Sequence, residues 1–257
     1  MIKWFDLDGV SPFRERAKIY AKARPSYPKA AVRFIFEEAV VPGGGVIVDV
    51  GAGTGLGTNL LAGHGKSVIG VDPNLEMLRA ASPGPGVFLM AGRAERLPFG
   101  NATISLMISF NAFHWFQPEP FFAEARRVLK LPGALALVWN NWELSDPFTA
   151  RFVSLMRSFA PDLPPEDREV EVEPLYATRL FTNVRRASFE NVHTLNLEGL
   201  RLRLQSVSYI PRSGPDWDRA SSELDSLFQT FADRDGLVRH RYQTSVFVAE
   251  SSQFSIP

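Results

Sequence analysis

Three glycines, at every second position from 51 to 55, constrain the fold of this chain more than any other feature. They follow the β-branched run 46–50 (VIVDV), which is typical of a buried strand, and precede the stretch 56–61, which is predicted to be helical. Glycine allows the backbone to turn sharply and to approach a ligand closely. Because open α/β sheets bind ligands at the carboxyl ends of their strands, the loop predicts both an α/β fold and a ligand site.

The segment from about residue 45 to residue 140 alternates between short apolar runs and helical stretches. Strands are predicted at 46–50, 68–72, 87–90, 104–109 and 134–139, and helices at 74–81 and 118–130. Continuous apolar strands separated by helices indicate a parallel sheet that is covered on both faces.

The pattern changes beyond residue 140. Asp146 and Pro147 predict the start of a helix with an apolar stripe. A proline-rich acidic loop is expected over 161–174, strands over 184–195 and 242–248, and helices over 198–207 and 217–233. We therefore expect one domain in three parts: an N-terminal lid (1–40), a ligand-binding core (41–140), and cap helices with the last strands (141–257).

Composition limits the classes of function. The 257 residues carry 28 basic and 28 acidic side chains, so no net charge attracts a nucleic acid. The chain has no cysteine, and its histidines lack the spacing of metal ligands, so no metal site is expected. The amino terminus lacks the pattern of a signal peptide, and the apolar stretch 104–116 falls short of the ~20 residues of a membrane helix. We expect a cytoplasmic protein without nucleic acid or membrane as partner; the oligomeric state stays open.

The glycine spacing discriminates between nucleotide-binding loops. The dinucleotide pattern G-x-G-x-x-G fails, because Leu56 and Thr58 occupy the sixth positions counted from Gly51 and Gly53. No Gly-Lys-Ser/Thr follows, so the phosphate loop of nucleoside triphosphatases is excluded as well. These failures argue against a nicotinamide oxidoreductase. Asp72 ends the next strand, where a carboxylate can accept hydrogen bonds from both hydroxyls of a ribose.

The block from Val48 to Asn140 resembles the class I S-adenosylmethionine-dependent methyltransferases, within them the small-molecule branch that includes trans-aconitate methyltransferases. The motifs that carry the resemblance are the acidic-x-Gly-x-Gly-x-Gly loop (49–55), GRAERLPF (92–99), NAFHWF (111–116), RVL (127–129), WN (139–140), and Tyr-x-x-x-Arg-Pro-x-Tyr-Pro (20–28). Segments 208–211 and 242–244 match more loosely. Arg93 and Asn111 depart from the branch, which often has Asp and Gln there, and Leu131 replaces a basic residue.

This resemblance implies a doubly wound, Rossmann-like sheet of seven strands with the last antiparallel, an N-terminal helical lid, and a helical insertion after strand five. It also implies S-adenosyl-L-methionine as cofactor, S-adenosyl-L-homocysteine as product, and a small-molecule O, N or C nucleophile as methyl acceptor. The residues expected at the cofactor are Tyr20, Arg24, Asp49, Gly51, Ala52, Gly53, Thr54, Asp72, Pro73, Met77, Ala94, Glu95, Asn111 and Ala112.

Three aromatic residues are expected beside the acceptor: Trp115, Trp142 and Tyr209. Aromatic faces suit a pocket near a sulfonium ion, because the ring quadrupole attracts the positive charge. Tyr20 and Arg24 lie one helical turn apart and can face one ligand, although the same spacing fits a solvated basic helix.

His114 is the candidate catalytic residue. As a general base it would take a proton from a hydroxyl or an amine. The alternatives are that it orients ligands by hydrogen bonds, since a carboxylate acceptor needs no base, or that it only packs. A protein of this fold that binds the same cofactor but catalyses another reaction, such as cyclisation, would carry the same binding motifs.

Overall fold

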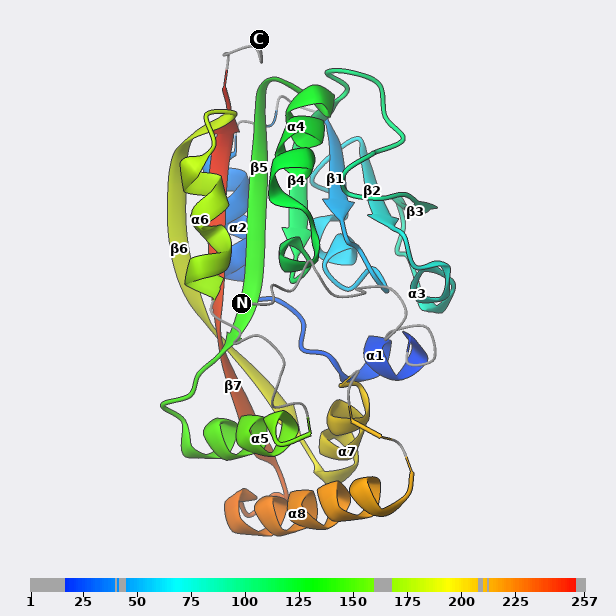
Figure 1. Ribbon diagram of the computed structural model, residues 1–257, viewed down its shortest axis with the longest axis vertical. Helices are drawn as coiled ribbons and strands as arrows, with labels where there is room; N and C mark the ends of the chain where they lie inside the picture. The colour runs from blue at the N-terminus through cyan, green and yellow to red at the C-terminus, as the bar shows by residue number, and fades with distance from the viewer. Residues whose placement is uncertain are drawn as a thin grey trace.

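The computed structural model describes residues 17–39, 41, 45–159, 168–207, 210–211 and 213–252. A seven-stranded sheet with the order β3-β2-β1-β4-β5-β7-β6 organises them (Figure 1). Its strands are β1 (Val46–Val50), β2 (Ser67–Asp72), β3 (Val87–Ala91), β4 (Ile104–Phe110), β5 (Leu129–Trp142), β6 (Phe181–Leu195) and β7 (Val238–Ser251). The first five strands pair in parallel, and β7 runs antiparallel between β5 and β6. The predicted Rossmann-like sheet with an antiparallel last strand is therefore confirmed.

Helices cover both faces of this sheet because the central strands are apolar on both sides. Every residue of β4 is buried. On one face, Val32 and Ile35 of α2 (Lys29–Glu38) pack against the sheet. On the other face, α4 (Pro118–Val128) contributes Phe121 and Phe122 to a second cluster, and α6 (Arg168–Ala177) lies beside it (Figure 1). The apolar alternation of the sequence thus results in three layers.

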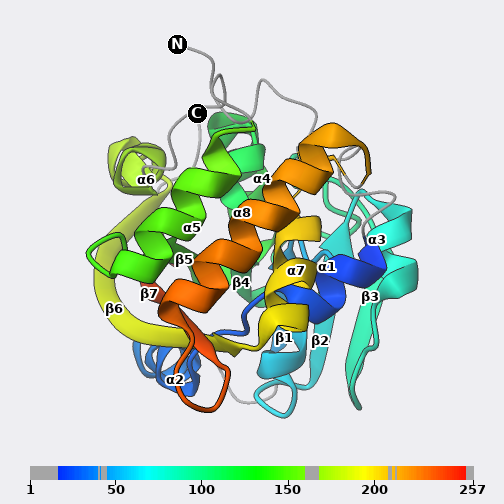
Figure 2. The same cartoon turned by 90° about the horizontal axis from the view of Figure 1, so that it is seen from below.

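A cap of four helices lies across one end of the sheet: α1 (Ala17–Ala23), α5 (Pro147–Arg157), α7 (Leu197–Gln205) and α8 (Pro215–Phe231). In Figure 1, β1 and β4 point down toward these helices, and Figure 2 shows the four helices next to one another. The predicted helix start at Asp146 is confirmed: its Oδ2 accepts a hydrogen bond of 2.9 Å from Thr149 N, so Asp146 is the N-cap residue of α5. The cap has its own apolar core, which includes Phe152, Leu200 and Leu224. It covers the carboxyl ends of the parallel strands, where α/β folds bind ligands.

Two local predictions are wrong. Residues 168–174 belong to α6 and not to a loop, because Val172 and Leu175 are buried against the sheet and this burial outweighs the acidic, proline-containing composition; residues 161–167 lie outside the described part. The stretch after the glycine loop forms only a 3-10 helix, η3 (Thr58–Leu61), and no α-helix. The cap helices come from three places in the chain: α1 precedes β1, α5 follows β5, and α7 and α8 lie between β6 and β7. No helix in the described ranges has the length and apolar character needed to cross a membrane.

Candidate active site

The glycine loop lies at the carboxyl end of β1 and folds across the end of β2. Gly51, Gly53 and Gly55 have φ angles of +75°, +56° and +78°, which side chains rarely allow. Gly51 N and Ala52 N donate hydrogen bonds of 2.8 and 3.1 Å to Val71 O. A Cβ on Gly51 would lie 2.4 Å from the Cβ of Ala112. The turn therefore favours glycine at all three positions, and the contact with the segment after β4 requires it at Gly51.

Asp72 ties this loop to the end of β2. Its Oδ2 accepts a hydrogen bond of 2.8 Å from Gly53 N, and its Oδ1 accepts one of 2.8 Å from Asn74 N. Burial raises the pKa of Asp72, and the two backbone hydrogen bonds oppose that rise. A carboxylate has about four lone-pair positions, so the group keeps acceptor capacity toward a ligand.

Asp49 lies beneath the loop, buried within β1. Its Oδ2 accepts a hydrogen bond of 2.6 Å from Thr58 Oγ1, whereas its Oδ1 has no partner among the described residues. Burial and, to a smaller extent, the charge of Asp72 raise the pKa of Asp49 to about 7, against the opposing effect of the hydrogen bond from Thr58. An unpartnered buried acceptor is costly, and it marks a place where a ligand donor or cation would be stabilising.

Helix α3 (Leu75–Ala80) begins three residues after Asp72. Asn74 caps it, because its Oδ1 accepts hydrogen bonds from Glu76 N (3.0 Å) and Met77 N (3.3 Å). Met77 is buried with its Cε 3.2 Å from the position of a Cβ on Gly53, and Pro73 is exposed. Thr54 of the loop is also buried. Met77 is thus placed directly against the glycine loop.

The stretch 92–99 after β3 is held by α4. Ala94 is buried, and Glu95 Oε1 accepts a hydrogen bond of 3.2 Å from Gln117 N. The other oxygen of Glu95 lies 3.8 Å from Arg93 Nε. In the described structure, Glu95 therefore links this stretch to the start of α4.

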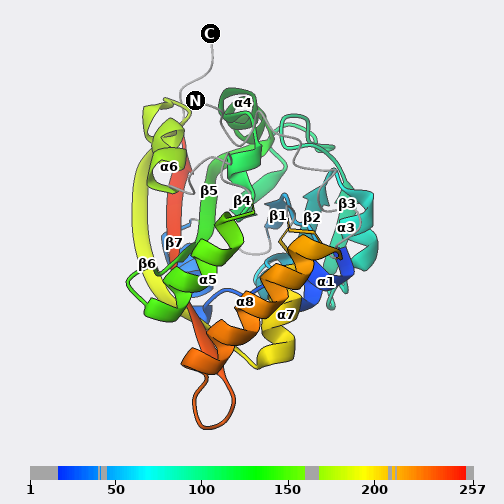
Figure 3. The ribbon, with the colours of Figure 1, turned by 60° about the horizontal axis from the view of Figure 1, so that its bottom comes forward.

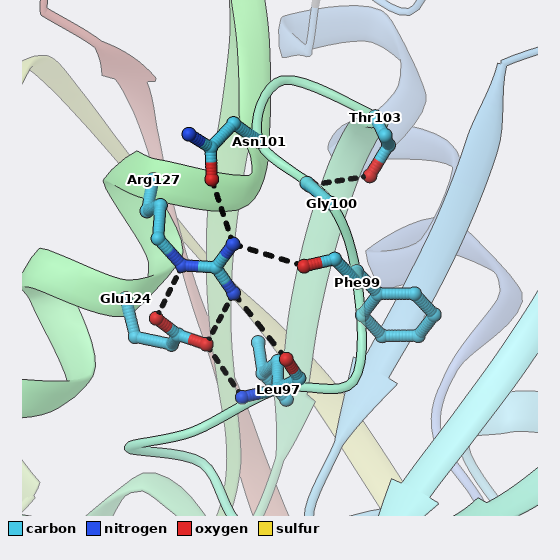
Figure 4. Close-up of polar contacts among 7 residues, drawn as sticks. All are labelled: Leu97, Phe99, Gly100, Asn101, Thr103, Glu124 and Arg127. Carbon is cyan, nitrogen blue, oxygen red and sulfur yellow. Dashed lines mark hydrogen bonds and ion pairs between the residues drawn. The ribbon is translucent and has the colours of Figure 1, made fainter.

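Arg127 of α4 clamps the end of the same stretch (Figure 4). Its Nη1 donates to Phe99 O (2.9 Å) and to Asn101 Oδ1 (2.8 Å), and its Nη2 donates to Leu97 O (3.3 Å). Glu124 completes the clamp, because it pairs with the guanidinium at 2.7 Å and accepts a hydrogen bond of 2.5 Å from Leu97 N. The Arg-Val-Leu motif thus supplies a residue that fixes the loop beside the site.

Asn111 joins the ends of β4 and β5. It has a φ of +51°, and its backbone N donates a hydrogen bond of 2.7 Å to Val138 O. Its Oδ1 accepts a hydrogen bond of 2.7 Å from Asn140 N. Asparagine tolerates this left-handed backbone better than most residues, so the position suits Asn. Ala112 follows it and contacts the glycine loop as described above.

His114 lies in η4 (Phe113–Trp115), directly after β4, and is 9% exposed. Its Nδ1 accepts a hydrogen bond of 3.4 Å from Trp139 Nε1 of β5. Trp115 is half-buried with its ring 5.2 Å from that of His114. Trp142, at the end of β5, packs against the apolar core of the cap. Tyr209 lies outside the described residues, and so does the side chain of Tyr20, whose backbone belongs to α1.

The segment after α1 is anchored to the sheet by side chains that sequence reasoning did not select. Ser26 O accepts hydrogen bonds from Asn140 Nδ2 (3.2 Å) and Asn191 Nδ2 (2.8 Å). Thr244 Oγ1 donates to Asn140 Oδ1 at 2.5 Å. The Tyr27 ring lies 4.6 Å from that of Phe110 at the end of β4. This network holds this part of the lid beside the site. Tyr27, Asn140 and Thr244 lie in the matched motifs, whereas Asn191 does not.

The fold and the site define an α/β protein whose glycine loop and strand-end carboxylates suit a ligand without phosphates. Residues 48–137 match a family model described as a methyltransferase domain. The chain is 30% identical to an uncharacterized methyltransferase of Schizosaccharomyces pombe over 82% of this chain and 84% of the relative. An uncharacterized methyltransferase-like protein of the same yeast is 29% identical over 94% and 96% of the two chains.

Among solved structures, the chain is similar to a candidate type II methyltransferase from Anaeromyxobacter dehalogenans, with 25% identity and a TM-score of 0.65. That alignment covers 89% of this chain and 96% of the other. The chain belongs to the class I S-adenosylmethionine-dependent methyltransferases, and it is an enzyme of that family.

Proposed function

We propose that the enzyme transfers a methyl group from S-adenosylmethionine to an O, N or C nucleophile of a small molecule in the cytoplasm. The observation that carries this proposal is the four-helix cap over the carboxyl ends of β1 and β4, on the same edge as the glycine loop (Figure 3). A site that is covered in this way suits a small acceptor better than a polymer. The resemblance to the small-molecule branch supports the same conclusion.

The residues of the site fit the cofactor. Asp49 Oδ1 is a buried acceptor without a partner in the described structure, and Asp72 keeps acceptor capacity. Two carboxylates beside one loop suit a ligand that bears positive charge and a ribose. In this proposal Asp72 holds the ribose, the glycine loop and Met77 line the nucleoside, and the stretch around Ala94 and Glu95 borders the adenine.

When bound, S-adenosylmethionine supplies an electrophilic methyl group to the acceptor. The protein then contributes by positioning the two reactants and excluding water, which can account for most of the acceleration of such a displacement. The proposed acceptor side is formed by Trp115 and by the cap around Trp142.

We propose that His114 orients a ligand as a hydrogen-bond donor. The indole N–H of Trp139 points at His114 Nδ1, so a neutral imidazole in this arrangement carries its proton on Nε2. That nitrogen can donate a hydrogen bond but cannot accept a proton. The contact with Trp139 therefore supports orientation over the general-base alternative.

The proposed function is tested by incubating the enzyme with S-adenosylmethionine and a panel of small acceptors, followed by mass spectrometry. A product heavier by one methylene group, formed together with S-adenosylhomocysteine, supports methyl transfer. Consumption of the cofactor with a product of another mass would favour a non-methylating reaction such as cyclisation.

The role of His114 is tested by comparing pH–rate profiles of the wild type and His114→Gln. We expect a slower variant, by about 10-fold, with a profile of unchanged shape. A rising limb near pH 6.5 in the wild type that disappears in the variant would establish the base role instead.

A further inference from the structure

Arg203 is a buried cation for which the cap provides almost no compensation. It belongs to α7 and is 1% exposed. Its Nη1 donates a hydrogen bond of 3.3 Å to Ser206 Oγ, and its Nε is buried without a partner. Within the described ranges no carboxylate pairs with it. By contrast Arg201, two positions earlier, is partly exposed and pairs with both oxygens of Asp225.

Two histidines lie near this guanidinium, at facing positions of adjacent strands. His193 of β6 pairs with His240 of β7, and the Tyr242 hydroxyl lies 2.8 Å from His240 Nδ1. His240 Nε2 and His193 Nδ1 are both buried, and neither has a hydrogen-bond partner in the described part of the chain. The cluster of Arg203, His193 and His240 thus presents three buried nitrogens whose hydrogen-bonding capacity the fold leaves unused.

This cluster carries a net positive charge. Burial, together with the charge of Arg203, lowers the pKa of His193 to about 4 and that of His240 well below its usual range. The charge of Arg24 lowers the pKa of His240 further. Both histidines are therefore neutral near pH 7, and the charge comes from the arginines. A ligand anion would be attracted by that charge and could accept a hydrogen bond from a histidine nitrogen that carries a proton.

The cluster lies at the same end of the sheet as the glycine loop. Tyr242, which contacts His240, pairs in the sheet with Trp142 at the end of β5. Helix α7, which carries Arg203, packs against α1 and against β6 within the cap (Figures 2 and 3). The cap is also where the proposed function places the acceptor.

A buried and unpaired guanidinium destabilises a fold unless a ligand or partner compensates it. We propose that Arg203, with His193 and His240, forms a subsite that binds an oxyanion group of the methyl acceptor. The inference rests on the proposed function and names the substrate class: small molecules that carry a carboxylate, phosphate or sulfate. The planar guanidinium favours such groups because its N–H donors match two oxygens at once.

The test uses Arg203→Met, with Arg201→Met as the matched control on the same helix. Without ligand, we expect Arg203→Met to unfold about 2–4 °C above the wild type, because an uncompensated buried charge is removed. Arg201→Met should stay within about 2 °C of the wild type, because its ion pair is partly exposed. An unfolding temperature of Arg203→Met equal to or below that of the wild type would overturn the proposal, since Arg203 would then be a structural residue.

The second measurement is the rise in unfolding temperature that added anions cause in the three proteins, each saturated with S-adenosylhomocysteine. The anions are citrate, benzoate, phenyl phosphate and sulfate, and benzamide is the neutral probe. We expect at least one anion, but not benzamide, to stabilise the wild type and Arg201→Met, with at least a 10-fold weaker effect on Arg203→Met. The preferred anion distinguishes carboxylate from phosphate and sulfate. No anion-specific stabilisation, or equal stabilisation of all three proteins, would overturn the subsite.

Binding of S-adenosylhomocysteine distinguishes a failure of the subsite from a failure of the proposed function. If all three proteins bind it but the anion results are negative, only the subsite is wrong. If the wild type itself does not bind it, the proposed function fails.

Discussion

Asp72 combines an observed contact with the backbone and a proposed contact with the ligand. Its carboxylate holds Gly53 N and Asn74 N, and in the proposed function it also receives the ribose. We expect Asp72→Ala to weaken S-adenosylhomocysteine binding by about 10–100-fold, measured by calorimetry, because about 1.4–2.8 kcal/mol of hydrogen bonding is lost. Glu76→Ala, which removes an exposed carboxylate of the adjacent helix, is the control. A folded Asp72→Ala protein with unchanged affinity would show that Asp72 only closes the turn.

Asp49 gives a prediction for pH. Its pKa is raised from 3.8 to about 7 by burial, so the folded protein holds a proton that the unfolded chain releases near pH 4. Stability contributed by this group is therefore lost as the pH rises from about 4 to about 7, by up to about 4 kcal/mol. Asp49→Asn has no such loss, so its free energy of unfolding should exceed that of the wild type by a margin that grows over this range and then stays constant.

The control for this prediction has the opposite sign. Asp233 accepts hydrogen bonds from Leu237 N and Asp235 N, which hold its pKa below the usual range. Asp233→Asn should therefore lose stability relative to the wild type above about pH 4. Denaturant titrations at several pH values measure both differences. Parallel curves for the wild type and Asp49→Asn would contradict the raised pKa.

At the scale of elements, the clamp of α4 on the loop 97–101 depends on Arg127. Arg127→Met removes the charge-assisted bonds to Glu124 and the bonds to the loop carbonyls, so we expect a loss of about 2–3 kcal/mol in the free energy of unfolding. The Leu97 amide should also exchange hydrogen faster, because its acceptor Glu124 is no longer held.

Arg126→Met is the matched variant, because Arg126 has no hydrogen bond among the described residues and its Nε is buried without a partner. Equal stability of the two variants, with unchanged exchange at Leu97, would mean that the clamp contributes nothing.

Helices and strands could be predicted where the spacing of apolar residues along a short segment was regular. The strands β1 to β4 and the helix α4 lie within one or two residues of their expected bounds. Residues 168–174 were not, because the acidic composition hides the two apolar side chains, Val172 and Leu175, that the sheet buries. A short segment of this kind becomes helical through tertiary contact and not through its own propensity.

At the scale of the whole molecule, the positions of the glycine loop and of the carboxylates at the strand ends could be predicted, whereas the contacts of the lid and of the cap could not. Asp49, Gly51 and Asp72 lie near one another in sequence, and the order of strand, loop and strand fixes their positions. The anchor of the lid joins Ser26 to Asn191 across 165 positions, which no local pattern records. Arg203 resembles any cation of an amphipathic helix until the fold buries it.

Calorimetric titration of the purified protein with S-adenosylhomocysteine and with NAD tests the central claim most directly, because it needs no knowledge of the acceptor. The spacing of the loop and the carboxylates of Asp49 and Asp72 predict saturable binding of S-adenosylhomocysteine and none of NAD. Tight binding of NAD with no heat from S-adenosylhomocysteine would contradict the assignment of the site.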